Sequence, residues 1–151
     1  MIKRINRRLL GAVLALQALL WSHGVGAGRQ VAVIVNRAAP TSSLTTETIR
    51  AYYLKQHKEW PSGEKVRPIQ QEGQAHAAFV GKVLKMSNAD YERYWLERKY
   101  SAAETPPKLV DDDEAVVKFV GAMKGAIGYI DAGSLDEKAR SKVKVIHVFT
   151  L

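Results

Sequence analysis

The chain has 151 residues, of which 46% are hydrophobic, and a formal net charge of +8 at pH 7. It contains no cysteine, which excludes disulfide bonds, a thiolate nucleophile and a cysteine metal site. Four of its 23 basic residues fall within the first eight positions, so the remainder carries only a mild basic excess and does not predict a nucleic-acid partner.

Residues 1–27 are typical of a secretory signal peptide. A basic start precedes an apolar run over 9–21, and Val25, Gly26 and Ala27 predict cleavage before Gly28. An uncleaved anchor is the alternative, but this run is shorter than the roughly 20 residues that cross a bilayer. With no cysteine, the leader predicts a bacterial periplasmic protein, and the remainder, 28–151, has the size of one domain.

The first predicted strand, 31–35, is a continuous apolar run that ends at Asn36, as expected for a strand covered on both faces. In the loop 37–43, the hydroxyls of Ser42 and Ser43 are candidate ligand contacts, although turn formation is the commoner role.

An amphipathic helix is predicted from Thr45 or Thr46 to Leu54, because its apolar positions recur at three and four residues. The polar segment 55–65 is predicted to be a turn from which Trp60 folds back on the core.

The segment 66–83 predicts a strand (66–69), a polar loop (70–73) and a helix that begins near Gln74. A helix N-terminus presents unpaired backbone N–H groups and a positive partial charge, which suit an anion. His76, in the first turn, is the histidine we retain as a candidate anion donor. The alternative is an ordinary turn that binds nothing.

Helix starts are predicted next at Ser87, which has Asp90 three residues on, and at the acidic run 111–114. We read the aromatic stripe that contains Tyr91 and Trp95 as core packing, and the acidic run as a first helical turn, not a metal site. The segment 100–109 is predicted to be irregular. Strands are predicted at 126–131 and 143–149, with a short helix or turn between them.

Alternating strands and helices predict an α/β domain with a mostly parallel sheet flanked by helices. Ligands of such sheets bind beyond the carboxyl ends of the strands, which would bring together Asn36, the loop 41–43, the loop 70–76 and Asp131. No nucleophile or paired carboxylate stands out, so catalysis is not predicted, and no cofactor is expected.

The chain from 30 to 149 resembles the phosphate ABC-transporter substrate-binding protein family, which has the type II periplasmic binding protein fold. The resemblance is carried, in order, by VAVIVN, SSLTTETIRAYYL, KEWPSGEKVRPI, GQAHAAFVGKVL and GAIGYID. Family members have two lobes that close on a ligand, and this chain has room for about one. The resemblance implies a non-enzymatic single lobe whose ligand is phosphate or a similar small anion, with an ABC-transporter permease or another periplasmic protein as a candidate partner.

The chain departs from the family at the binding loop, where members have an Arg followed by Ser-Gly-Thr. Gln70 falls nearest the Arg position, and Gly73, Gln74 and Ala75 replace Ser-Gly-Thr, so the guanidinium and the hydroxyls are missing. Weak oxyanion binding therefore stands beside an alternative, an accessory protein that uses the lobe as a scaffold to dock a partner or to self-associate. The candidate ligand-binding residues are Asn36, Ser42, Ser43, Gln70, Gln71, Gly73, Gln74, Ala75 and His76.

Overall fold

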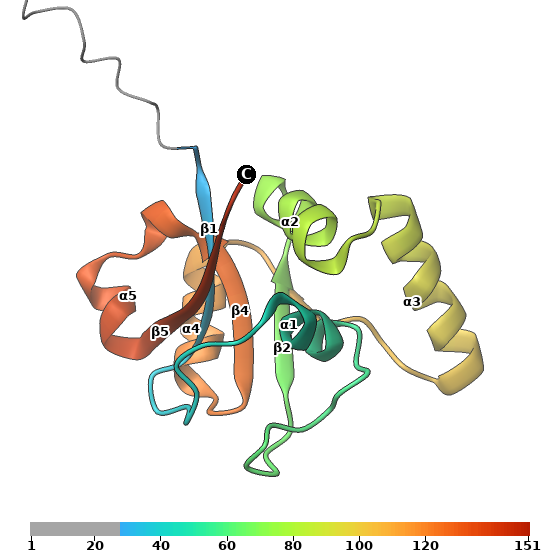
Figure 1. Ribbon diagram of the computed structural model, residues 1–151, viewed down its shortest axis with the longest axis horizontal. Coiled ribbons are helices and arrows are strands. Elements are labelled where there is room, and N and C mark those ends of the chain that lie inside the picture. Colours follow the sequence, from blue (N-terminus) through green and yellow to red (C-terminus); the bar gives the residue numbers. More distant parts are fainter. Residues whose placement is uncertain (1–27) are drawn as a thin grey trace, which may run out of the picture.

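The computed structural model describes residues 28–151 (Figure 1). The predicted signal peptide, 1–27, lies outside the described residues. Among the described helices, none combines the length and the apolar character needed to cross a bilayer.

Five strands alternate with helices along the chain. The elements, in order, are β1 (Gln30–Asn36), α1 (Thr46–Tyr53), β2 (Arg67–Gln71), α2 (Gln74–Phe79), the π-helical turn η1 (Val80–Leu84), α3 (Asn88–Ala102), β3 (Lys108–Val110), α4 (Asp113–Ala122), β4 (Ala126–Asp131), the 3-10 turn η2 (Ala132–Ser134), α5 (Glu137–Lys142) and β5 (Val143–Thr150).

The strands form one sheet in the order β3-β2-β4-β1-β5. β2 pairs in parallel with β3 and β4, whereas β1 pairs antiparallel with both β4 and β5. The α/β prediction is confirmed, but the sheet is mixed and not mostly parallel. A continuous apolar run indicates that a strand is buried on both faces, but it does not indicate whether the strand is parallel or antiparallel to its neighbours.

Helices cover both faces of this sheet, as Figure 1 shows with α1 in front and α4 behind. Alternate residues of β1 point into the two layers: Val31, Val33 and Val35 pack with α1, η1 and α3, while Ala32 and Ile34 pack with α4 and α5. The predicted burial of this strand on both faces is confirmed.

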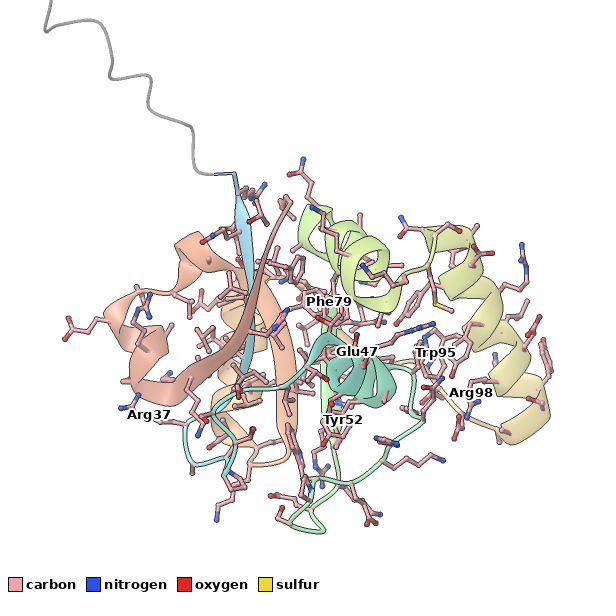
Figure 2. All side chains as sticks on the ribbon, in the orientation of Figure 1. Arg37, Glu47, Tyr52, Phe79, Trp95 and Arg98 are labelled. Atoms are coloured by element: carbon pink, nitrogen blue, oxygen red, sulfur yellow. The ribbon has the colours of Figure 1, made fainter. Side chains whose placement is uncertain are left out.

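Aromatic side chains fill the layer between α1, α2 and the sheet. The ring of Phe79 stacks on that of Tyr129 with centroids 4.1 Å apart, and the ring of Tyr53 lies 4.4 Å from that of Phe79. Figure 2 places Trp95 on the side of α3 that faces α1, and this ring is buried, as predicted. Trp60 also folds onto the core, where its Nε1 donates to the Gly125 carbonyl oxygen at 3.1 Å.

Side-chain oxygens cap three of the helices, at Thr45 and Ser87 as the sequence predicts and at Asp112 within the acidic run that was expected to form a first helical turn. Thr45 accepts from the backbone N–H of Thr48, Ser87 from that of Asp90, and Asp112 from that of Ala115. These bonds satisfy N–H groups that a helix start leaves free.

Two predicted boundaries are wrong. β2 continues to Gln71 because it pairs with β3, a strand inside the segment that was predicted to be irregular. α3 also runs on to Ala102. The three residues of β3 have too little local pattern to be recognised, and their pairing with β2 makes them a strand.

Candidate functional site

The predicted site divides between the two ends of the sheet. Because β1 is antiparallel, Asn36 lies beside Val143 at the amino end of β5, whereas Val31 lies beside Asp131 at the carboxyl end of β4. The expected meeting of Asn36 with the loop after β2 is therefore wrong.

Asn36 instead holds the end of β1 against α4. Its Nδ2 donates to the carbonyl oxygens of Val120, at 3.0 Å, and Gly121, at 2.9 Å. Ser42 and Ser43 follow in an exposed loop, and none of these three predicted residues borders the cavity described next.

A cavity of about 290 Å³ lies at the carboxyl ends of β2 and β4, beside the first turns of α2 and α4. Of the predicted residues, Gln71, Gln74 and Ala75 line it, together with Asp131, which the topology argument had added. Glu72 also lines it and belongs to the loop 70–76 that the same argument placed there. The remaining lining residues, which the sequence prediction missed, are Arg29, Asp111, Asp112, Asp113 and Glu114.

Gln70 and Gln71 point to opposite faces of β2 because side chains alternate along a strand. Gln70 is buried on the α3 side, where its Oε1 accepts from the Tyr91 hydroxyl at 2.6 Å. Gln71 is buried on the cavity side, where its Nε2 donates to the carbonyl oxygen of Tyr129 at 2.8 Å. Both amides are therefore engaged within the protein.

The carboxylate of Asp113 collects the hydrogen-bond donors at this end of the sheet. It accepts from Gln71 Nε2 at 2.6 Å, from Ser134 Oγ at 2.5 Å and from the backbone N–H of Asp131 at 3.3 Å. These donors are engaged by an internal carboxylate, so they are not free to bind an anion.

Arg29 reaches the same cavity from the start of β1. Its guanidinium pairs with the Asp131 carboxylate, and its Nη1 donates to Gln74 Oε1 at 2.6 Å. The hydrogen bond from Arg29 lowers the pKa of Asp131. Sequence reasoning missed Arg29 because only the reversed direction of β1 brings its amino end to the carboxyl end of β4.

The electrostatic balance of the cavity opposes an anion. Six carboxylate side chains border it, against the one guanidinium of Arg29. The first turn of α2 supplies an attraction, since its N-cap, Gly73, offers no capping side chain. A helix dipole amounts to about half an elementary charge, which is far less than the uncompensated carboxylates.

Gly73 has a backbone role rather than a place in the cavity. Its φ of 85° and ψ of −157° fall in a region that essentially only glycine adopts. Gly73 lets the chain turn from β2 into α2.

His76 faces inward from the first turn of α2. Its Nδ1 lies 2.7 Å from the Tyr129 hydroxyl, and the two rings are stacked. Burial lowers the pKa of His76, with Glu72 acting in the opposite direction, and burial also raises the pKa of Tyr129. At neutral pH the arrangement suits a neutral imidazole that accepts from the tyrosine, rather than one that donates to an anion.

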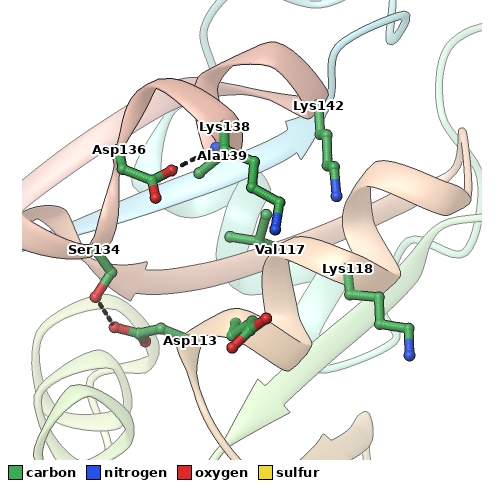
Figure 3. A pocket seen from close by; sticks show the side chains of 9 residues that line it. Asp113, Val117, Lys118, Ser134, Asp136, Lys138, Ala139 and Lys142 are labelled. Atoms are coloured by element: carbon green, nitrogen blue, oxygen red, sulfur yellow. Dashed lines mark hydrogen bonds between the residues drawn. The ribbon is translucent and has the colours of Figure 1, made fainter.

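A second cavity, of about 470 Å³, lies between α4 and α5 (Figure 3). The side chains of Lys138 and Lys142 extend over it from the α5 side, while Val117 and Ala139 supply apolar surface. Three lysines and three acidic residues border this cavity, so neither sign of charge prevails. Nowhere in residues 28–151 do three or more His, Asp or Glu side chains gather in a group that could hold a metal ion.

The sequence matches no family model and no curated protein. The fold, however, is similar to solved phosphate transport proteins. An ABC-type phosphate transport receptor from Vibrio cholerae has 21% sequence identity and a TM-score of 0.58, with 80% of this chain and 47% of that chain covered. PstS from Borrelia burgdorferi has 12% identity and a TM-score of 0.62 at the same coverage.

A third neighbour, a phosphate ABC-transporter substrate-binding protein from Clostridium perfringens with bound phosphate, has 19% identity and a TM-score of 0.59 over 80% of this chain and 45% of that chain. The chain therefore spans about half the length of the solved structures it matches. Identities this low establish the fold, and the chain corresponds in structure to one lobe of such proteins.

Proposed function

We propose that the chain is a non-enzymatic periplasmic docking module that keeps one lobe of the substrate-binding-protein fold as a scaffold. The observation that carries this proposal is the carboxylate of Asp113, which takes up the donors of Gln71, Ser134 and Asp131. Donors that are engaged within the protein are not free to bind phosphate at this cavity.

The chemistry of the cavity supports docking over phosphate capture. A charge-assisted contact contributes about 1.5–3 kcal/mol and a neutral hydrogen bond about 1 kcal/mol, so losing a guanidinium and two hydroxyls weakens an oxyanion site by several orders of magnitude. The surrounding carboxylates weaken it further through like-charge repulsion.

The second candidate function is weak binding of phosphate or another small oxyanion at the first turn of α2. Its support is the absence of a capping side chain at Gly73. It requires an anion to lie among the six carboxylates of the cavity.

Isothermal titration separates the two functions. The full chain is expressed in a bacterium, and the exported protein is titrated with phosphate and, for comparison, with sulfate. The docking proposal predicts no heat of binding up to millimolar anion. Micromolar phosphate affinity would overturn it.

A substitution in the first turn of α2 locates any binding that is seen. Ala75→Asp adds a negative charge where an oxyanion would lie, and Ala75→Asn is a control of similar size without that charge. Loss of binding in the first variant alone would establish the second candidate.

A further inference from the structure

An apolar groove of about 450 Å³ lies along α3, where that helix meets Gln70 of β2 and the segment 105–106. Tyr91 and Trp95 form its buried floor, and Leu96 and Pro106 stand at its sides. Figure 1 shows α3 at the outer end of the molecule, away from β5. This groove lies apart from the acidic cavity beside α2, with which it shares no residue.

Large apolar side chains gather around this groove. Leu96 is 56% exposed and Tyr100 is 80% exposed, one turn further along the same helix. Leu109 is 50% exposed and pairs in register with Gln70, which lines the groove. Apolar side chains clustered in this way mark a binding surface more often than isolated ones do.

Charged residues frame the apolar surface in a self-complementary way. Glu92, Leu96, Lys99 and Tyr100 follow one another at spacings of four, three and one, which places them along one stripe of α3. We call these four residues the α3 stripe. All four side chains are exposed, and neither Glu92 nor Lys99 is in an ion pair within the part of the chain that the structure describes.

We propose that the α3 stripe docks on the α3 stripe of a second copy of this chain, with the two helices antiparallel about a two-fold axis close to Leu96. Glu92 lies four residues before Leu96 and Lys99 three residues after it, which is about 6 Å and about 4.5 Å along the axis at 1.5 Å per residue. In an antiparallel pair, each Glu92 therefore lies within about 1.5 Å of the level of the partner's Lys99. The two leucines meet at the centre.

The same symmetry explains why the acid and the base are both needed. A two-fold interface brings the same patch of each copy together, so a patch must complement itself. A purely acidic or purely basic stripe would repel its copy, whereas an acid at one end and a base at the other attract it in the antiparallel orientation only. This inference rests on the proposed docking function and names the partner.

Sedimentation velocity of the exported protein, from low micromolar to several hundred micromolar, tests for the dimer. A concentration-dependent shift from monomer to dimer is expected. Leu96→Glu should abolish that shift, while Glu137→Gln, on the distant helix α5, should leave it unchanged. A monomer at every concentration would overturn the inference.

Charge reversal tests the orientation. Glu92→Lys and Lys99→Glu each place like charges opposite one another and should weaken dimerisation by about tenfold or more, which corresponds to about 1.4 kcal/mol. The double variant restores both pairs and should recover the wild-type dimer. The proposed pairing would be overturned if the single reversals left dimerisation unchanged. It would also be overturned if the double variant did not restore dimerisation.

These outcomes are independent of the phosphate titration. If the chain bound neither phosphate nor a second copy of itself, the docking proposal would stand with another protein as the partner, and the dimer would be overturned. Micromolar phosphate binding would overturn the docking proposal whatever the sedimentation result. Thermal unfolding of each variant reports whether it is folded, and the exposure of the substituted side chains predicts little change.

Discussion

The carboxylate of Asp113 accepts a hydrogen bond from the side-chain amide of Gln71 at 2.6 Å, between the first turn of α4 and the carboxyl end of β2. Gln71 is only 5% exposed, so this amide has little access to water. The bond connects a helix to the sheet at the cavity beside the start of α2, where the sequence predicts an anion. Asp113 therefore has two roles: it lies in the acidic first turn of α4, and its carboxylate borders the cavity and binds donors there.

Asp113→Ala should destabilise the fold. The substitution leaves the buried Nε2 of Gln71 with one acceptor fewer and removes the partner of Ser134, which we expect to lower the free energy of unfolding by about 1–3 kcal/mol. Urea denaturation measures this change. Asp111→Ala is the matched control, because Asp111 is exposed, and it should stay within about 0.5 kcal/mol of wild type. Equal effects of the two variants would contradict the role assigned to Asp113.

His76 should make stability depend on pH below neutrality. Burial lowers its pKa beneath the ordinary value of 6.5, so between these two values the unfolded chain holds the proton more tightly than the folded chain. The free energy of unfolding therefore falls as the pH decreases from about 6.5 to the folded pKa, and His76 contributes no slope above 6.5.

Denaturant unfolding across this pH range checks the assignment. His76→Gln should flatten the slope, whereas His57→Gln, at an exposed position, should leave it in place. A slope that survives in the His76 variant would place its origin elsewhere.

Gly128 permits the close approach of β4 and α4. A Cβ at this position would lie 2.5 Å from Val116 Cγ1 and 3.0 Å from Val120 Cγ2. Gly128→Ala should therefore lower the free energy of unfolding by about 1–3 kcal/mol through overpacking. Gly81→Ala is the control, because a Cβ there meets nothing within 4 Å.

A second substitution identifies the clash at Gly128. Val116→Ala removes the nearest contacting atom, so the combined variant should lose less stability than the sum of the two single variants. Additive losses would show that the two side chains do not compete for the same space.

Export should remove the predicted signal peptide. When the full chain is expressed in a bacterium, we expect the mass of the periplasmic product to correspond to a chain that begins at Gly28. Replacing both Leu14 and Leu16 with Arg interrupts the apolar run and should keep the protein in the cytoplasm. A periplasmic product that keeps its leader would support a retained anchor.

Local patterns determined much of this protein. The apolar run of β1 predicted a strand buried on both faces, and Thr45, Ser87 and Asp112 lie at the helix starts that the sequence indicated. Such features depend on residues within a few positions of one another. A capping side chain bonds to a backbone N–H two or three residues on, and the side chains of a strand alternate between its two faces. The same proximity explains why the short strand β3 and the extension of β2, which depend on each other, were missed.

Tertiary structure alone decided which residues form the cavity. The run of apolar residues in β1 reads the same in either direction, and only its antiparallel pairing with β4 places Arg29, rather than Asn36, beside Asp131. These two charged residues are 102 positions apart in the chain. No local pattern encodes so distant a pairing, because it follows from how the strands of the whole sheet pack together.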